Sequence, residues 1–404
     1  MQSPHVIVIG AGVAGLAVAQ GLKKRNITFS VYERDGLLDS RRQGYRIKIS
    51  GELKDKLVKL LPAEIFKIVE ETSARTVLGE TNINASSGSI TASRRGRVPP
   101  GAATPLTIDR GLLRQALMTG ISEFVHFGHE FERYEEATAD DTEGPKVCAF
   151  FANGSSKSGS MLLGVDGSKS RVRQQLVPGP QYIQDTDTCC VYGKTQLSAE
   201  LQEQCPESHR RWLTVVKDEA PFTQNIIFGD GPVVMVLEPC RFSNRHMYTQ
   251  LPEDYVHWGI MFRPGMLRVQ AKELDYVLRD GAKLALGLTA DWHQSIRCLV
   301  ELQDSQLTVA MRVYSSPINI PVWRSSAVVT ILGDAAHTMS PAGGVGAVAA
   351  LHDACAVVDM IVNDKISVDT IARLEQGMRS SAEIMLQRTD AASRCMLGIG
   401  LAAS

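Results

Sequence analysis

The first fifteen residues contain the feature that most limits the fold of this chain. The apolar, β-branched run Val6–Ile9 is typical of a buried parallel strand, and residues 14–25 have the pattern of a helix. Gly10, Gly12 and Gly15 lie at the junction of the two segments. In such a unit the first glycine permits the tight turn, the second lets a pyrophosphate approach the backbone, and the third allows close helix–strand packing. The sequence therefore predicts a nucleotide-binding β–α–β unit.

The next predicted strand, Thr28–Glu33, ends in a carboxylate. It lies about 20 residues beyond the glycines, where an acidic residue accepts hydrogen bonds from ribose hydroxyls. Glu33 would repel a 2′-phosphate, so the site favours FAD or NAD over NADP. Arg34 is a further candidate contact, although an arginine beside an acid is commonly a solvated charge. The helix N-terminus would offer free N–H groups to the pyrophosphate.

A second glycine-rich segment, ILGDAAHTMSPAGGVGA, occupies residues 331–347. The predicted strand Ala327–Leu332 leads into Gly333 and Asp334, whose carboxylate can accept hydrogen bonds from a polyol such as ribitol. The alternative is that Asp334 caps a turn and that the later glycines keep a loop mobile. Apolar residues at helical spacing from Ala347 to Ile361 predict a helix directly after these glycines. Because its N-terminus would stabilise negative charge on a reduced flavin, the two segments together predict an FAD site.

His337 lies within this second segment and is a candidate for catalysis. A single histidine beside a turn more commonly forms hydrogen bonds with the backbone. We therefore predict a structural role for His337, with catalysis as the alternative.

Composition excludes several other classes of function. Lys+Arg 43 against Asp+Glu 44 gives a net charge of −1, which provides no electrostatic footprint for nucleic acid. The eight cysteines include no C-x-x-C pair and no zinc-like spacing with histidine, so we expect no metal site and a reduced, cytoplasmic chain. No apolar run reaches the roughly 20 residues that span a bilayer, and the first strand begins too early for a signal peptide. We expect a soluble monomer or homodimer.

The pattern changes between Thr188 and Phe262 to short alternating strands. This change predicts a mainly antiparallel β-sheet substrate domain inserted into an α/β, Rossmann-type FAD-binding domain, followed by C-terminal helices. The predicted strands of the insertion include Cys190–Lys194, Asn225–Phe228, Val233–Leu237 and His257–Phe262. The predicted division is an FAD-binding domain (1–75, 104–178 and 300–365), a substrate-binding domain (76–103 and 179–299) and C-terminal helices (366–404).

Three motifs in this order resemble those of class A FAD-dependent aromatic monooxygenases, a group that includes p-hydroxybenzoate hydroxylase and tetracycline-inactivating monooxygenases. The motifs are GAGVAG at 10–15, GVDGSKSRVR at 164–173 and GDAAHTMSPAGGVGA at 333–347. They span nearly the whole chain, whose general appearance is similar to oxygenases of fungal secondary metabolism. Because there is no second G-x-G-x-x-G motif, the resemblance implies that NADPH or NADH is a transient reductant bound in a surface groove.

The resemblance also implies roles for individual residues around a noncovalently bound FAD. Glu33 would hold the adenosine ribose, Asp334 the ribitol, and Asp166 would brace the loop near the pyrophosphate. Tyr45 and Arg46 fall in the segment that the family places over the isoalloxazine ring, and an exposed basic loop is the alternative. The implied cofactor-binding residues are Gly10, Gly12, Gly15, Glu33, Arg34, Arg110, Asp166, Gly333, Asp334, Pro341, Gly344, Val345, Gly346 and Ala347.

The expected activity is monooxygenation at the expense of NAD(P)H, inserting one atom of O₂ into an aromatic or alkaloid-like small molecule through a flavin C4a-hydroperoxide. Because the cofactor supplies this chemistry, no side chain is assigned to catalysis, and Arg46 is the one candidate. We predict a substrate pocket between the inserted sheet and the flavin, with ordinary sheet core as the alternative for each residue. Its predicted lining residues are Tyr45, Tyr192, Trp258, Ile260 and Phe262.

Two other functions stay open at this point. A flavin-dependent halogenase would have a related fold, but its Trp-x-Trp-x-Ile-Pro signature is absent because the four tryptophans are isolated in the sequence. A non-catalytic binding protein would keep the FAD fold without its chemistry, and the intact second and third motifs argue against that reading. A yellow purified protein would separate both flavoenzyme functions from the binding protein.

Overall fold

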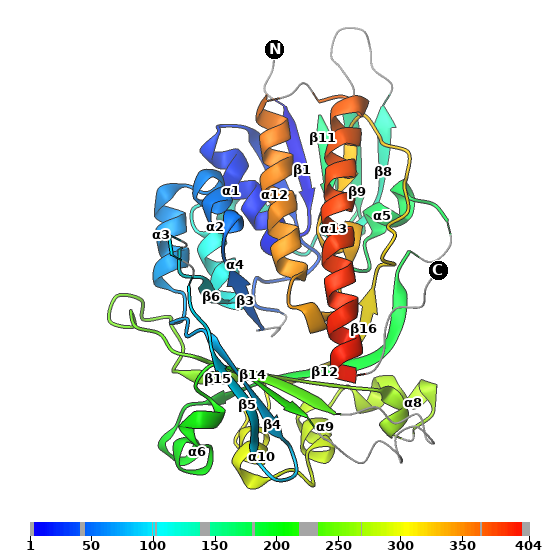
Figure 1. The fold of residues 1–404 in the computed structure, drawn as a ribbon. Helices are drawn as coiled ribbons and strands as arrows, with labels where there is room; N and C mark the ends of the chain where they lie inside the picture. Colours follow the sequence, from blue (N-terminus) through cyan, green and yellow to red (C-terminus); the bar gives the residue numbers. More distant parts are fainter. Residues whose placement is uncertain are drawn as a thin grey trace.

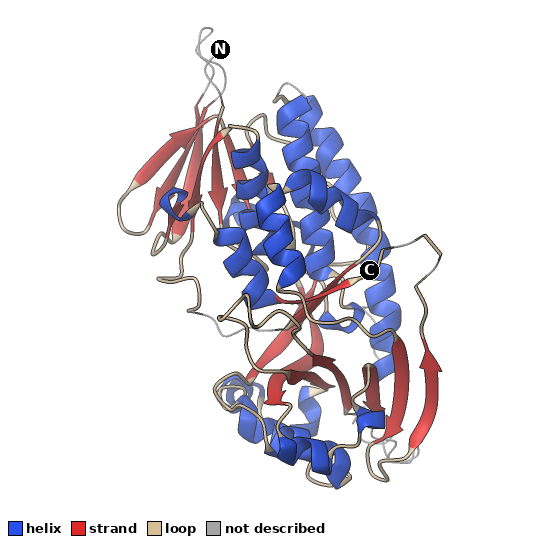
Figure 2. Ribbon diagram, turned by 90° about the vertical axis from the view of Figure 1, so that its left-hand side faces the viewer, coloured by secondary structure: helices blue, strands red, loops and turns tan. Residues whose placement is uncertain are grey.

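The computed structural model describes residues 4–40, 45–98, 100–101, 103–137, 146–179, 182–217, 233–267, 269–363 and 366–397. Two layered halves, each built on its own sheet, lie one above the other in Figure 1. Most of the long helices belong to the upper half, whereas the larger sheet and a group of short helices form the lower half, as the turned view of Figure 2 also shows.

The upper half is built on a five-stranded parallel sheet with the order β17–β11–β1–β2–β7. Its strands are β1 (His5–Ile9), β2 (Thr28–Tyr32), β7 (Val125–His126), β11 (Met161–Gly164) and β17 (Val329–Ile331). Val6 and Val8 pack into the apolar core beneath the helices, whereas Ile7 and Ile9 pack into the core on the opposite face. Both faces of the sheet are therefore buried, as is usual for parallel strands.

Helices cover one face of this sheet, and a small antiparallel sheet covers the other. The helices of the first face are α1 (Val13–Lys24), α2 (Glu52–Leu60), α3 (Ala63–Glu71), α4 (Arg110–Met118) and α12 (Gly346–Asn363). The second face carries β8 (Phe131–Ala137), β9 (Lys146–Phe151), β10 (Ser156–Gly159) and α5 (Arg171–Leu176). The long helix α13 (Val368–Leu397) runs beside α12 and extends down to the lower half (Figure 1).

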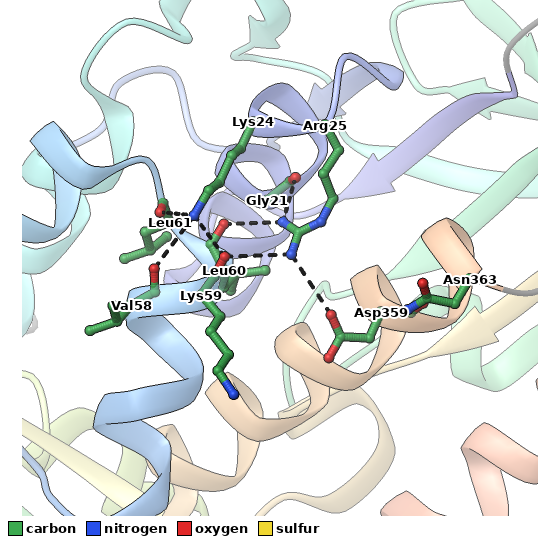
Figure 3. A network of polar contacts seen from close by, with 9 residues as sticks. All are labelled: Gly21, Lys24, Arg25, Val58, Lys59, Leu60, Leu61, Asp359 and Asn363. Carbon is green, nitrogen blue, oxygen red and sulfur yellow. Dashed lines mark hydrogen bonds and ion pairs between the residues drawn. The ribbon is translucent and has the colours of Figure 1, made fainter.

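The end of α1 is fixed to the end of α2 by side chains that reach unpaired backbone carbonyls (Figure 3). Lys24 Nζ donates to the carbonyl oxygens of Lys59 and Leu61, each at 2.7 Å. The Arg25 guanidinium lies 3.8 Å from the Asp359 carboxylate of α12. The last carbonyl groups of a helix have no hydrogen-bond donor within that helix. Here the two cations donate to the carbonyl groups at the end of α2, and they link α1 to α2 and α12.

The lower half is a seven-stranded sheet with the order β16–β12–β15–β14–β13–β4–β5, antiparallel except for the β13–β4 pair. Its strands are β4 (Gly79–Asn84), β5 (Ile90–Arg95), β12 (Gln184–Gln196), β13 (Leu213–Lys217), β14 (Val234–Cys240), β15 (Tyr255–Phe262) and β16 (Val309–Ser315). Short helices pack on its outer face, namely α6 (Ala199–Gln204), α8 (Ala271–Val277), α9 (Gly281–Leu288) and α10 (Gln294–Glu301). This architecture confirms the predicted fold class.

The predicted segments that the structure describes agree with these elements, and one predicted domain boundary differs. β16 pairs with β12, so the lower sheet continues past the predicted domain boundary at residue 299. The strand β6 (Leu106–Asp109) lies directly before α4. The predicted strand Asn225–Phe228 lies outside the described residues, and the remaining domain boundaries stay predictions.

Among the described residues, α12 is the one helix that is long and apolar enough to cross a membrane. Half of its 18-residue window is buried inside the protein, where it packs against α1 and α2. A central helix of an α/β domain is apolar because it is covered on several sides. The composition of α12 is therefore explained by its place in the fold.

Candidate functional site

The three glycines of the first motif occupy three sterically different positions. Gly10 has a φ of +110°, and a Cβ there would lie 2.4 Å from the carbonyl oxygen of Val165. A Cβ on Gly15 would lie 2.1 Å from the carbonyl oxygen of Gly10, so only glycine allows α1 to begin this close to β1. A Cβ on Gly12 would meet nothing within 4 Å. The loop is therefore tightly packed on one side and open at Gly12.

The Glu33 carboxylate lies directly against this loop. Its two oxygens accept hydrogen bonds from the backbone N–H groups of Ala11 at 2.8 Å and Asp35 at 3.0 Å. The side chain of Arg34, in contrast, is exposed to solvent. Glu33 is thus positioned at the end of β2 as predicted, whereas Arg34 has the surroundings of a solvated charge.

Arg114 of α4 is a buried residue beside this loop that the sequence reasoning missed. Its guanidinium donates to the carbonyl oxygen of Ala11 at 3.0 and 3.2 Å and to that of Leu38 at 2.6 Å. It is 6% exposed, so the charge is held inside the protein by backbone oxygens. The sequence signal for its burial was its place beside Leu113 and Leu117, which face inward on α4.

The second motif forms a turn, a short helix and the start of α12. Gly333 has a φ of +57° and precedes α11 (Asp334–His337). Solvent reaches the Asp334 carboxylate, but protein atoms surround it closely enough that desolvation raises its pKa. The charges of His337 and Arg110 act to lower this pKa but do not outweigh the desolvation. Asp334 Oδ1 lies 3.9 Å from the position that a Cβ on Gly346 would take. The carboxylate therefore lines a recess beside the first turn of α12.

His337 is held by a carboxylate rather than by the backbone. Its Nε2 lies 2.6 Å from Asp353 Oδ2, which also accepts a hydrogen bond from the backbone N–H of Gly333 at 2.9 Å. Burial acts to lower the pKa of His337, but the adjacent Asp353 outweighs it and the pKa is raised. These contacts favour the structural role, because the pair fixes the turn that presents Asp334.

The remaining predicted cofactor residues surround the same region. Asp166 Oδ2 accepts hydrogen bonds from the backbone N–H groups of Arg171 at 2.8 Å and Val172 at 3.4 Å. Its Oδ1 is buried and has no partner among the described residues. Pro341 opens a 3-10 turn (Pro341–Gly343), and Gly344 ends it with a φ of +62°. Val345 then leads into α12, whose first two residues are Gly346 and Ala347.

A two-stranded ribbon, β3 (Arg46–Ile49) with β6, lies over the lower sheet and joins the two halves by ion pairs. Arg46 Nε lies 2.5 Å from Glu238 Oε2, and Lys48 Nζ lies 2.7 Å from Glu238 Oε1. Glu238 belongs to β14 and is 3% exposed. Arg46, the candidate for catalysis, is therefore engaged with a buried carboxylate between the two halves.

A second buried carboxylate joins the same two halves. Asp109 caps α4 through Oδ1, which accepts hydrogen bonds from the backbone N–H groups of Gly111 and Leu112. Its Oδ2 accepts from Lys194 Nζ at 2.5 Å and from the Tyr255 hydroxyl at 2.6 Å. Burial acts to raise the pKa of Asp109, but the charge and hydrogen bond of Lys194 lower it overall. Asp109 therefore stays ionised as the N-cap of α4.

Aromatic side chains line the space between the ribbon and the recess. The rings of Tyr45 and Tyr192 are 6.0 Å apart, and the Arg110 guanidinium lies 5.4 Å from the Tyr45 ring centre. Burial raises the pKa of both tyrosines, and the negative charge of Asp334 acts on each in the same direction. The structure therefore brings Tyr45, Arg110, Asp334 and Tyr192 together, as the predicted site requires.

Three predicted pocket residues lie on the opposite face of the sheet. Trp258, Ile260 and Phe262 are each 0% exposed and pack beneath the outer helices, in one core with residues of α9 and α10. The prediction of a substrate-lining role for them is wrong. Alternation along β15 correctly placed them on one face, but it does not say which face is turned to the cofactor. His257 pairs with Lys194, and Tyr255 pairs with Gln196, across the β12–β15 ladder. These residues are on the other face of the sheet, together with Tyr192.

The described residues contain no cluster of histidine, cysteine or acidic side chains suited to a metal ion. All eight cysteines fall in described segments and are free thiols. Most of them are buried, and burial raises the pKa of the Cys190 and Cys240 thiols to about 12, so these do not serve as thiolate nucleophiles. The polar groups that remain for chemistry are those between the two halves, where Arg46 meets Glu238 and Lys194 meets Asp109.

Known proteins share this architecture. No protein-family model matches the sequence. The chain is 40% identical, over 98% of its length, to the dual O-methyltransferase/FAD-dependent monooxygenase CTB3 of Cercospora beticola. It is also 40% identical, over 86% of its length, to the dual O-methyltransferase/FAD-dependent monooxygenase elcB of Phaeosphaeria nodorum. These matches cover 46% and 39% of the two relatives, so the chain spans about half of their length or less.

A solved structure from Photorhabdus luminescens, described as an FAD-containing monooxygenase, is similar along its whole length. The TM-score is 0.77 at 25% identity, covering 98% of this chain and 99% of the other. Together with the fungal relatives, this likeness confirms the resemblance seen in the three sequence motifs.

Proposed function

We propose that this chain, a homologue of FAD-dependent monooxygenases, binds FAD and uses NAD(P)H and O₂ to insert one oxygen atom into an aromatic small molecule. One observation carries the proposal. The open glycine loop with Glu33 and the recess with Asp334 lie at the carboxyl ends of β1, β2 and β17, which are strands of one parallel sheet. Ligands of open α/β sheets bind at this edge.

The residues present fit an FAD molecule at both ends. Gly12 leaves room for a pyrophosphate, Glu33 offers acceptors to ribose hydroxyls, and Asp334 offers them to ribitol. The unpartnered Oδ1 of Asp166 lies in the loop after β11, next to these groups in the sheet order. When bound, FAD supplies the reduction by NAD(P)H and the activation of O₂, so the chain itself needs to bind, orient and exclude water. We expect noncovalent binding.

The substrate would lie between the recess and the lower sheet. There Tyr45 and Tyr192 provide aromatic surface, and the ion pairs of Arg46 and Lys194 border it. The fungal relatives are named for O-methyltransferase as well as monooxygenase activity. We infer that the substrate of this chain carries phenolic hydroxyl groups, since a methyltransferase acting in the same route requires a free hydroxyl.

We place the protein in the cytoplasm, as a monomer or homodimer without nucleic-acid or membrane partners. The free thiols support a reducing compartment, and the net charge of −1 gives nucleic acid no attraction. The two fungal relatives are named as monooxygenases, so the comparisons provide no support for the halogenase alternative.

The decisive experiment is purification followed by flavin analysis and a turnover assay. The protein should be yellow, should release all of its flavin on acid precipitation, and should oxidise NADPH or NADH faster when hydroxylated aromatic compounds are added. Mass spectrometry should detect a product heavier by one oxygen atom. A colourless protein that FAD cannot reconstitute would contradict the proposal.

Glu33→Ala and Asp334→Ala should each weaken FAD binding by roughly 10- to 100-fold, because hydrogen bonds to charged groups contribute about 1.5–3 kcal/mol. The two residues would hold opposite ends of the cofactor, so the losses should multiply in the double variant. Dissociation constants from fluorescence titration of the FAD-free protein measure this. Glu132→Ala, which removes an exposed carboxylate of β8, is the control and should bind FAD normally. A double variant no weaker than either single variant would refute independent contacts.

A further inference from the structure

An open pocket lies on the lower half, beside the ribbon β3–β6. It measures about 290 Å³ with its mouth included, and the residues that form it include Arg75, Arg211, Trp212, Glu238, Pro239 and Arg241. None of these is a predicted cofactor or substrate contact. Pockets for whole small molecules usually measure about 300–1,000 Å³, so this arginine pocket suits one polar group of a ligand better than a whole aromatic substrate.

The arginine pocket can be reached from solvent. Arg75 and Arg211 are exposed, and Arg241 is half-buried. Arg75 lies between α3 and β4, where the chain passes from the upper half to the lower half, whereas Arg241 directly follows β14. The backbone N–H of Arg75 donates to the carbonyl oxygen of Arg241 at 2.8 Å. This hydrogen bond holds the two arginines side by side, although they are far apart in the sequence.

The third arginine is positioned by a fixed aromatic ring. The Arg211 guanidinium lies 5.4 Å from the centre of the Trp212 ring. The indole Nε1 of Trp212 donates to Thr81 Oγ1 at 2.7 Å, and the ring packs so closely on Gly79 that a Cβ there would lie 2.3 Å from it. Because guanidinium groups stack on aromatic faces, Trp212 gives Arg211 a fixed support at the pocket.

The arginine pocket holds more positive charge than its one carboxylate balances. Glu238 is already engaged outside the pocket, by Arg46 at 2.5 Å and by Lys48 at 2.7 Å. In the described part of the chain, the three arginines of the pocket have no ion pair or hydrogen bond with another side chain. Like charges gathered in one place repel one another and destabilise the compact state. A bound anion would remove this repulsion.

We propose that Arg75, Arg211 and Arg241 form a binding site for a phosphate group. Guanidinium groups bind phosphate through paired N–H···O hydrogen bonds, and a phosphate monoester offers three acceptor oxygens and a charge of about −1.5 to −2 at pH 7. A carboxylate offers two oxygens and a single charge, which three guanidinium groups exceed. The phosphate group comes either from free inorganic phosphate or from the 2′-phosphate of NADPH. Only the second source rests on the proposed function.

The test is isothermal titration calorimetry of the protein in excess FAD, which keeps the pyrophosphate site occupied. Potassium phosphate, added at constant ionic strength, should bind saturably. Arg75→Ala and Arg241→Ala should each weaken this binding about tenfold, because a hydrogen-bonded charge is lost. Arg241→Lys keeps the charge without the paired N–H groups and should have an intermediate affinity. Arg279→Ala is the matched control, since it removes an exposed arginine of the lower half outside the pocket and should bind phosphate normally.

NADP⁺ and NAD⁺ distinguish the two sources, because they differ by one phosphate monoester. If NADPH is the source, NADP⁺ should bind about tenfold more tightly than NAD⁺, and Arg241→Ala should abolish the difference. If inorganic phosphate is the source, the two nucleotides should bind equally and phosphate binding alone should depend on Arg241. The proposal would be overturned if neither phosphate nor NADP⁺ bound saturably, or if Arg75→Ala and Arg241→Ala bound both as the wild-type protein does. Failure of the proposed function would differ, since FAD itself would then not bind.

Discussion

Gly15→Ala should unfold or severely destabilise the nucleotide-binding half of the molecule, although it adds a single methyl group. The new Cβ would lie 2.1 Å from the carbonyl oxygen of Gly10 and 3.2 Å from its carbonyl carbon. Both are backbone atoms, so no side chain can rotate away, and α1 must separate from β1. Overpacking of a well-packed core typically costs about 1–3 kcal/mol, and this contact with fixed backbone should reach the upper end or exceed it.

Gly12→Ala is the matched control, because it makes the same change three residues earlier in the same loop. No atom lies within 4 Å of its Cβ, and its φ of −70° and ψ of 179° suit alanine. Unfolding of the FAD-free protein in urea should therefore show Gly12→Ala as stable as wild type, or more stable by about 0.4–1 kcal/mol. FAD affinity should nevertheless fall, since the methyl group occupies the open side of the loop. Equal loss of stability in the two variants would contradict this account.

The nucleotide-binding unit was predictable because its constraints are local. Gly15 is required by a backbone contact with Gly10, five residues earlier, and Gly10 by its own φ of +110°. Glu33 follows from the length of one helix and one strand. The cap at Asp109 is local too, since it bonds to N–H groups two and three residues later. Sequence patterns of this kind can be recognised without knowledge of the rest of the fold.

The lining of the proposed substrate site was not predictable in the same way. Strand alternation separates Trp258 from His257, but the choice of face depends on which layer covers each side of the sheet. The largest apolar residues of β15 pack beneath the outer helices, and its polar residues lie on the side of Arg46 and Lys194. Which face is covered depends on helices that follow β15 in the chain, such as α9. The sequence close to β15 therefore does not contain this information.

Buried ion pairs were also missed, because their partners are distant in sequence. Glu238 meets Arg46 and Lys48, which lie in a different half of the molecule. Each residue alone resembles a surface charge in the sequence. Only the placement of ribbon β3–β6 over the lower sheet shows that they are partners, and that Arg46 is held at the cleft by a carboxylate.

Asp353→Ala should destabilise the protein by about 3–5 kcal/mol at pH 6, the usual effect of removing one partner of a buried ion pair. One carboxylate oxygen, Asp353 Oδ2, serves both His337 and the backbone N–H of Gly333, and its loss leaves both without that acceptor. The two side chains are 2% and 6% exposed, so water cannot readily replace the missing acceptor. The turn before Asp334 should loosen as well, and FAD affinity should fall with stability.

The pH dependence of this loss tests whether the pair is ionised. The pKa of His337 is raised above its ordinary value of 6.5, so the pair contributes fully below that value, and the charge-dependent part is lost as pH rises through the raised pKa. The difference in unfolding free energy between wild type and Asp353→Ala should therefore be larger at pH 6 than at pH 9. Histidines with a lowered pKa, such as His257, have the opposite dependence, but they are common to both proteins and cancel in the difference. A difference that stays constant between the two pH values would show that His337 is neutral and that Asp353 acts as a hydrogen-bond acceptor alone.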